Sequence, residues 1–183
     1  FNEITASSLV KVDLDGNIVE PTEYMINPAG FTIHSAIHAA REDAKFVLHV
    51  HTDAGIAVAS TKEGLLPISQ HALIALPNLA YHDYEGIALD LDERERLVQD
   101  LGDKKALMLW NHGTLSVGET AAQCWMMIFY LERACAIQVM ASNPPFNANT
   151  VRQRGTNKQP GVLNRATQAG YTPGSTFKVV TAI

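Results

Sequence analysis

The chain has 183 residues, of which 46% are apolar and 18% charged, and its formal net charge is −5. These values are typical of a soluble globular protein, and the length is sufficient for one domain with a hydrophobic core. No uninterrupted apolar run reaches the roughly 18 residues that cross a membrane, and the first residues lack a signal-peptide pattern. We therefore exclude a membrane-spanning protein and expect a cytoplasmic one with no membrane partner.

The two cysteines, Cys124 and Cys135, fall within one predicted helix. The helical rise places them about 16 Å apart, which is too far for a disulfide. We expect two small buried thiols, in keeping with a reducing compartment.

Charge is distributed unevenly along the chain. Residues 1–142 hold all 19 acidic residues, whereas residues 143–183 hold five basic residues and no acidic one. The second segment is also rich in Asn, Thr, Gln, Gly and Pro, so we interpret the two segments as different in origin. A basic nucleic-acid-binding arm is the alternative, but its basic residues are scattered and its aromatic residues few, and we expect no nucleic-acid partner.

Hydrophobic periodicity predicts strands alternating with helices in residues 1–142. The expected elements are a hairpin at 7–20 turning at Asp15-Gly16, a helix at 27–43, a strand at 45–51, a short helix at 53–61, a strand at 65–68 followed by a short helix, a strand or loop edge at 79–86, a helix at 91–102 closed by Gly102, two strands at 105–118 with a turn at 111–113, and a long helix from 119 to about 140. This alternation favours an α/β domain, with a layered αβα sandwich as its architecture.

Two histidines interrupt the apolar strand predicted at 45–51. In an extended chain His49 and His51 project from the same face, so their rings can converge. Without a metal, a buried pair would need partners for its ring nitrogens, and the flanking apolar residues supply none. His112 follows a second apolar strand at a turn, where functional side chains are common. The pattern predicts an open three-histidine site for Zn²⁺ or another divalent metal ion, held by His49, His51 and His112.

The other histidines carry weaker signals. His34 and His38 are spaced by one helical turn and so are able to share a metal, but this spacing is more typical of core or helix-face residues. We predict no metal-binding role for His71 and His82.

These motifs resemble the class II aldolase and adducin head family, and the bacterial adducin-like branch most of all. The resemblance covers residues 1 to about 141 and lies in "FNEITASSLVKVDLDGNIVE", "INPAGFTIHSAIHAAREDAKFVLHVHT", "GLLPISQHAL", "AYHDYEGIALDLDERERLVQDLG", "NHGTLSVGET" and "YLERACAIQVMA". It implies an αβα sandwich around a mixed central sheet, a small-molecule substrate, and a homotetramer with active sites between subunits.

In the enzymes of this family three histidines hold a zinc or similar ion, and these match His49, His51 and His112. A tyrosine that protonates the carbanion falls at Tyr81 when a one-residue gap is allowed. The catalytic glutamate of the aldolases falls on Gly30, and glycine cannot accept a proton. Glu23 lies nearby in sequence, with nothing to mark it as a substitute. The family's glycine- and serine-containing substrate loops precede the first residue here, so residues 1–142 are expected to form a domain without its N-terminal part.

Residues 143–183 resemble the start of a penicillin-binding transpeptidase domain instead. The string "NRATQAGYTPGSTFKVVTAI" contains the family's S-x-x-K pair, which makes Ser175 the matching nucleophile and Lys178 its activating partner. The S-x-N and K-T-G motifs that complete such a site are absent, so we expect a fragment rather than an independent domain. We interpret the whole as a chimera, whether by fusion, by an assembly error or by a placeholder. If the tail is folded, a helix from Ser175 is expected to pack on an apolar surface.

Three functions follow from this reading. The first is a metal-dependent lyase that cleaves or forms a carbon–carbon bond in a small hydroxy-carbonyl compound, such as a sugar phosphate. The second is a non-catalytic oligomerisation or interaction module like the adducin heads, which Gly30 favours. The third is a truncated transpeptidase fragment.

Overall fold

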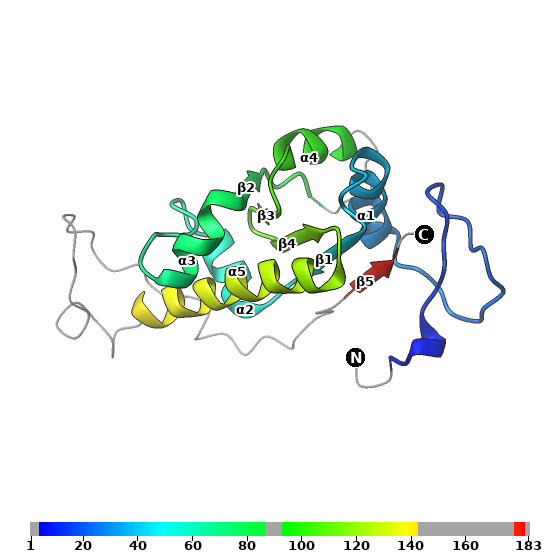
Figure 1. Ribbon diagram of the computed structural model, residues 1–183, viewed down its shortest axis with the longest axis horizontal. Coiled ribbons are helices and arrows are strands. Elements are labelled where there is room, and N and C mark those ends of the chain that lie inside the picture. The colour runs from blue at the N-terminus through cyan, green and yellow to red at the C-terminus, as the bar shows by residue number, and fades with distance from the viewer. Residues whose placement is uncertain (1–3, 87–92, 143–177, 182–183) are drawn as a thin grey trace.

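The computed structural model describes residues 4–86, 93–142 and 178–181 (Figure 1). Its elements, in chain order, are η1 (Ala6–Ser8), α1 (Pro28–Ala40), β1 (Phe46–Val50), α2 (Asp53–Ala59), α3 (Gln70–Ala75), η2 (Leu76–Asn78), β2 (Leu79–His82), α4 (Glu93–Leu101), β3 (Ala106–Leu109), β4 (Gly113–Gly118), α5 (Ala121–Ser142) and β5 (Lys178–Thr181). The predicted alternation of strands and helices is confirmed.

Five strands form one mixed sheet in the order β2-β3-β4-β1-β5. Strands β2 and β3 are parallel, and the remaining neighbours are antiparallel. In the register of β1 with β4, His49 lies opposite Leu115 and Val50 lies opposite Thr114. The end of β1 therefore lies beside the start of β4, directly after the turn that carries His112.

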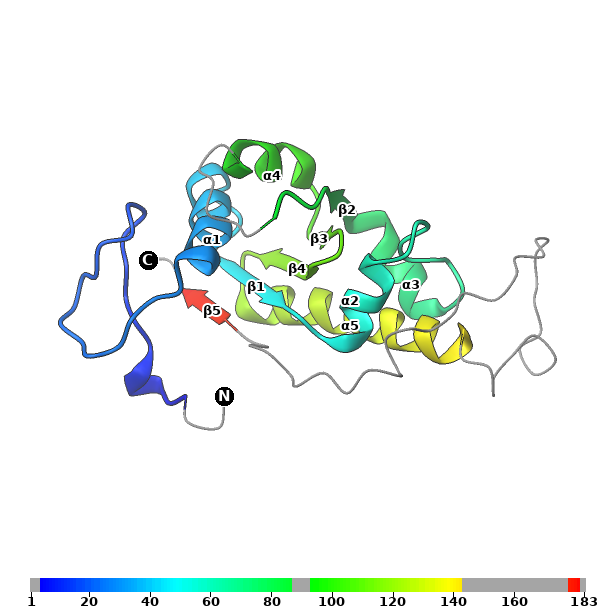
Figure 2. The ribbon, with the colours of Figure 1, turned by 180° about the vertical axis from the view of Figure 1, so that it is seen from behind.

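Helices cover both faces of the sheet, as the two views show (Figures 1 and 2). Helices α2, α3 and α5 pack on one face, where Leu48 and Val50 of β1 join their core. Helices α1 and α4 pack on the other face, where Val47 of β1 joins a second core. Burial of each such side chain contributes about 1.5–3 kcal/mol. The predicted αβα sandwich is confirmed, and strand alternation directs His49 to the face covered by α1 and α4.

Local capping explains where three of the helices begin. The Asn27 side chain accepts hydrogen bonds from the backbone N–H groups of Ala29, at 3.0 Å, and Gly30, at 3.4 Å, at the start of α1. Thr52 caps α2 and Ser69 caps α3 in the same way. Such caps are worth about 1 kcal/mol each.

Two predicted strand segments are wrong. In residues 7–20 the turn forms, with Gly16 at φ +90°, but a single bridge between Val12 and Ile18 replaces the hairpin strands. The ribbon of this segment runs outside the layered body (Figure 2). Its apolar residues Leu9, Leu14, Ile18 and Val19 stay about half exposed, so little burial stabilises paired strands there. Residues 65–68 form no strand because side chains take their backbone partners: Leu65 N–H donates to the Tyr81 hydroxyl, and Leu66 N–H to Gln138.

The expected helix from Ser175 is wrong where the structure describes it. Lys178–Thr181 form strand β5, which pairs antiparallel with β1 at the edge of the sheet. The edge of β1 offers unpaired backbone groups, and the β-branched residues Val179, Val180 and Thr181 favour an extended chain. Ser175 itself lies outside the described residues.

Helix α5 lies between the sheet and solvent. Within the described part of the chain it is the helix long and apolar enough to cross a membrane by length and composition. Its Ile128 and Leu131 are nevertheless buried in the core, as expected for the central helix of a layered domain. Cys124 and Cys135 are buried and free, and burial raises the pKa of both thiols. This agrees with the prediction of two small core thiols.

Candidate metal centre

Three histidines from two places in the sequence meet at one end of the sheet. His49 and His51 come from the end of β1, and His112 from the turn between β3 and β4. The Nε2 atom of His49 lies 2.7 Å from Nε2 of His51 and 3.3 Å from Nε2 of His112. One ring nitrogen of each lies within 4.8 Å of the others. The structure thus brings together the three residues that the sequence predicted.

Backbone geometry sets the direction of each ring. The Nδ1–H of His49 donates to the carbonyl of Thr114 at 3.0 Å, which leaves the lone pair of Nε2 directed at the cluster. Asn111 has a φ of 56°, in the left-handed region that Asn tolerates better than most residues, and its N–H donates to the Ala59 carbonyl at 3.0 Å. This strained turn projects the next residue, His112, toward the strand ends.

The donor set fits a divalent metal ion. Tetrahedral Zn²⁺ bound at 2.0–2.1 Å places its nitrogen ligands about 3.3 Å apart. The Nε2 atoms of His49 and His112 have this spacing, whereas those of His49 and His51, at 2.7 Å, would move apart when an ion binds. The carbonyl of Thr114 supplies the outer hydrogen bond that metal-binding histidines commonly make. His49 is buried, while His51 and His112 are partly exposed, so the cluster opens on the side of the latter two residues.

Electrostatics keep His49 neutral. Burial lowers its pKa well below the usual value for histidine, and the nearby rings of His112 and His51 lower it further. A neutral imidazole is the form that binds metal, because only it has a free nitrogen lone pair.

Gly113 provides the space in which the rings meet. A Cβ atom at this position would lie 2.5 Å from the carbonyl oxygen of Val50 and 3.0 Å from Cδ2 of His51. Any larger residue would force apart the end of β1 and the start of β4. Neither Gly113 nor Thr114 was predicted from the sequence, although both adjoin the predicted ligand His112.

Tyr81 is not brought to the three histidines. Its ring stacks on Trp110 at a centroid distance of 4.8 Å, and its hydroxyl accepts a hydrogen bond from Leu65 N–H at 3.2 Å. It packs against the core under α2, α3 and α5, on the sheet face opposite to His49. Burial raises the pKa of this hydroxyl. Its role as proton donor stays a prediction.

The remaining candidates occupy structural positions. Gly30 is buried in the first turn of α1, and Glu23 is exposed in the segment before that helix. His34 is fully buried on α1, and Nδ1 of His38 lies 2.7 Å from the carbonyl of Ala44. Among the described residues, the group able to hold a metal ion contains neither of these two histidines.

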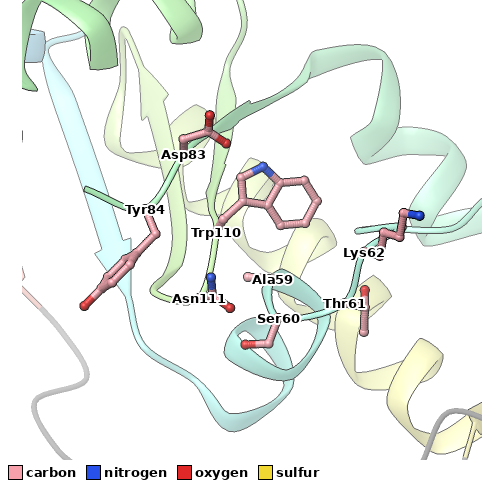
Figure 3. Close-up of a pocket in the computed structure, with 8 residues that line it drawn as sticks. All are labelled: Ala59, Ser60, Thr61, Lys62, Asp83, Tyr84, Trp110 and Asn111. Carbon is pink, nitrogen blue, oxygen red and sulfur yellow. The ribbon is translucent and has the colours of Figure 1, made fainter. Parts of the chain in front are cut away.

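An open depression of about 700 Å³ lies at the turn that precedes His112 (Figure 3). Trp110 lies between Asp83 on one side and residues 59–62 on the other, and Asn111 lines the same space. The segment 59–62 contributes two hydroxyls and the Lys62 ammonium. The lining of this depression reaches as far as Asn111, the residue before His112, and includes none of the three histidines.

The layered fold and the histidine cluster together define a class of protein. The family model for the Class II Aldolase and Adducin N-terminal domain matches residues 1–139, and the chain belongs to this family. A second model, for the penicillin binding protein transpeptidase domain, matches residues 127–183. Both resemblances found in the sequence are confirmed.

The chain is similar to several individual proteins. The "Putative aldolase class 2 protein" of Caulobacter vibrioides is 73% identical over 141 residues, which cover 77% of this chain and 55% of that protein. Alpha-adducin of Rattus norvegicus is 53% identical over 142 residues, or 76% of this chain and 19% of the adducin. The solved L-fuculose 1-phosphate aldolase from Glaciozyma antarctica PI12 is 29% identical with a TM-score of 0.64, over 75% of this chain and 53% of that one. The chain thus spans about half the length of the Caulobacter protein.

Proposed function

We propose that the chain is the metal-binding part of a class II aldolase-like lyase. It would act on a small hydroxy-carbonyl compound of the sugar-phosphate type, with Zn²⁺ or another divalent ion held by His49, His51 and His112. The observation that supports this most directly is the convergence of three imidazole nitrogens, with the His49 tautomer fixed by Thr114. The similarity to L-fuculose 1-phosphate aldolase supports the substrate class.

The bound ion would act as a Lewis acid toward a carbonyl or enediolate oxygen. The role of the chain is to hold the ion and to orient the carbonyl or enediolate of the substrate beside it. The depression beside Trp110 offers an aromatic surface and the hydroxyls of Ser60 and Thr61 to a polar ligand, and the Lys62 ammonium suits a negative one. Gly30 supplies no general base, so the proposal assigns no residue to that role.

Tyr81 is the proton donor in this proposal, and its position makes the assignment easy to test. The hydroxyl of Tyr81 is bonded to Leu65 N–H on the face away from His49. If turnover is observed, a Tyr81→Phe variant with unchanged kcat would remove this residue from the mechanism.

The proposal includes a cytoplasmic homotetramer. Trp125, Met126 and Phe129 of α5 are about half exposed, and such apolar surface is typical of protein–protein contacts. Light scattering of the purified chain gives its mass in solution, and a strict monomer would contradict the tetramer.

The central test measures metal content first and catalysis second. Elemental analysis should find about one divalent ion per chain, and His112→Ala should lose it. Retro-aldol assays over short sugar phosphates, with L-fuculose 1-phosphate included, should show turnover that a chelator abolishes and added Zn²⁺ restores. Turnover unchanged by the chelator would reject the mechanism.

A non-catalytic interaction module is the second candidate. It is favoured by Gly30 in place of the catalytic glutamate and by the 53% identity with alpha-adducin. Stoichiometric metal with no turnover on any substrate, together with a stable oligomer, would favour this candidate over the lyase.

A transpeptidase fragment is the third candidate, because the transpeptidase model matches residues 127–183. Labelling with a fluorescent penicillin tests this candidate, because the penicillin would acylate Ser175 in a working site. We expect no labelling, since the S-x-N and K-T-G motifs are absent from the sequence.

A further inference from the structure

A carboxylate lies behind the three histidines, on the other side of the sheet. Glu132 of α5 accepts the hydroxyl of Thr52 at Oε2 and the hydroxyl of Thr114 at Oε1. Thr52 directly follows His51, and Thr114 is the second residue after His112. One side chain therefore holds both segments that carry the histidines, although these are far apart in the sequence.

Thr114 connects Glu132 to His49 across the sheet. Its fully buried side chain points to the α5 face with Val50, its partner on β1, and donates to Glu132. Its carbonyl accepts the Nδ1–H of His49 at 3.0 Å on the other side. A shift of the Thr114 hydroxyl would therefore move the acceptor that orients His49.

Thr52 is fixed twice. Its hydroxyl oxygen accepts the N–H of Gly55 at 2.9 Å as the cap of α2, and its hydrogen goes to Glu132. A Cβ atom at position 55 would lie 2.8 Å from Oε1 of Glu132. The lack of a side chain at Gly55 thus leaves room for the carboxylate at the start of α2. Because Thr52 is bonded to Glu132, the backbone of the neighbouring residue His51 is held in place as well.

Burying this carboxylate is costly for the protein. Burial raises the pKa of Glu132, and the hydrogen bonds from Thr114 and Thr52 offset only part of that effect. A glutamine or an apolar residue would fill the same space at lower desolvation cost. Two charge-assisted hydrogen bonds to a carboxylate are, however, stronger and more directional than the neutral alternatives.

We propose that Glu132 is a positioning residue of the metal centre, which clamps Thr52 and Thr114 so that the rings of His49, His51 and His112 meet. This inference rests on the proposed function only in requiring that the histidines bind a metal. Glu132 touches neither the metal nor a substrate, and it acts through the two threonines and the backbone that they hold.

The test compares metal affinity between matched variants. Glu132→Ala removes the clamp, and Glu132→Gln replaces one of its two acceptor oxygens by an NH2 donor. Thr114→Val removes one of the hydrogen bonds while it keeps the carbonyl. The control is Gln138→Ala, because Gln138 is a buried polar residue of the same helix whose two hydrogen bonds go to Leu66 and Gly64. Zn²⁺ and Co²⁺ dissociation constants come from competition with a chelator, and the Co²⁺ absorption spectrum reports the coordination geometry.

We expect the Glu132 variants to bind metal about 10–100-fold more weakly, as for other outer-shell partners of metal ligands, with an altered Co²⁺ spectrum. Thr114→Val should have a smaller effect of the same kind, and Gln138→Ala should lower the melting temperature without a change in metal affinity. Glu132→Gln and Thr114→Val keep the test valid if the alanine variant does not fold.

Each other result overturns the inference. If the parent binds metal and the Glu132 variants bind it equally well, the inference alone fails. If Gln138→Ala weakens binding as much as the Glu132 variants do, the effect is general destabilisation and no clamp exists. If the parent binds no metal, the proposed function fails and the inference fails with it.

Discussion

At the residue scale, the absence of a side chain at position 113 allows the strands to approach around the histidines. Gly113→Ala would place a methyl group 2.5 Å from the Val50 carbonyl oxygen, and Gly118→Ala would place one 2.6 Å from the Cys124 nitrogen. The two glycines lie at opposite ends of β4, where Gly113 is the first residue and Gly118 the last. Overpacking at either position costs about 1–3 kcal/mol of stability. We expect both variants to melt at lower temperature, but only Gly113→Ala to weaken Zn²⁺ binding, by about tenfold or more. Equal weakening by both, measured by chelator competition, would contradict a local role for Gly113.

The lowered pKa of His49 predicts how stability depends on pH. The folded chain keeps His49 neutral, whereas the unfolded chain takes up a proton below pH of about 6.5. The unfolded state therefore gains protons that the folded state does not, and the free energy of unfolding falls as the pH drops below about 6.5. The slope is at most about 1.4 kcal/mol per pH unit.

Urea unfolding of the metal-free protein between pH 5 and pH 7 measures this slope. The variant His49→Asn retains an amide able to donate to Thr114 but does not titrate. It should show a flatter pH dependence than the parent, and an identical slope in the two proteins would refute the assignment to His49.

The convergence of the three histidines was predictable because its signal is local, whereas the contacts that support them were not. The alternation of a strand places His49 and His51 on one face, and the second strand and turn mark His112. Glu132 contacts Thr52 from 80 residues away in the sequence. No periodic pattern encodes such a contact, so only the folded structure reveals it.

At the scale of elements, predictions succeeded where both a periodic pattern and a packing partner exist. Helix α1 matches the predicted helix at 27–43 because Asn27 caps it and its apolar side packs on the sheet. The hairpin at 7–20 has an alternating pattern, but its apolar side chains stay about half exposed. Residues 65–68 lose their ladder partners to side chains. Pattern alone does not say which backbone groups will find strand neighbours.

A charged cluster ties the end of α1 to the start of β3. Asp43 accepts hydrogen bonds from Arg41 at 2.6 and 2.9 Å and from Lys105, while Arg41 also donates to the carbonyls of Gly102 and Lys104. Arg41 first, and then Lys105, hold the pKa of Asp43 well below its usual value. The resulting stability is present above pH of about 4 and is lost as the pH falls toward the pKa of the folded state.

Asp43→Asn should therefore lower stability at neutral pH by about 0.5–1 kcal/mol, since the pair is partly exposed, and should flatten the acid limb of the stability curve. The matched control is Glu20→Gln, which removes the exposed partner of Lys11 in the segment before α1. Thermal unfolding from pH 3 to pH 7 gives both curves. A control that loses as much stability as Asp43→Asn would show that the cluster has no special role.

At the scale of the whole molecule, the two segments of the chain meet along one edge of the sheet. Strand β5 pairs with β1, with Lys178 opposite His49 in the register. The positions of the histidines depend on the pairing of β1 with β4 and on the turn before β4, neither of which involves β5. The edge that β5 covers would be open to other strands in a shorter chain.

Removing residues 143–183 should therefore separate metal binding from solubility. We expect the chain of residues 1–142 to retain Zn²⁺ affinity within about threefold, because the β1–β4 pairing and the turn at His112 are intact. We also expect it to associate at lower protein concentration, because β1 becomes an edge strand with unpaired backbone groups. Chelator competition and light scattering on the two lengths measure these effects. Loss of metal binding on truncation would show that the tail contributes to the centre, and unchanged association would show that β5 does not protect the edge of β1.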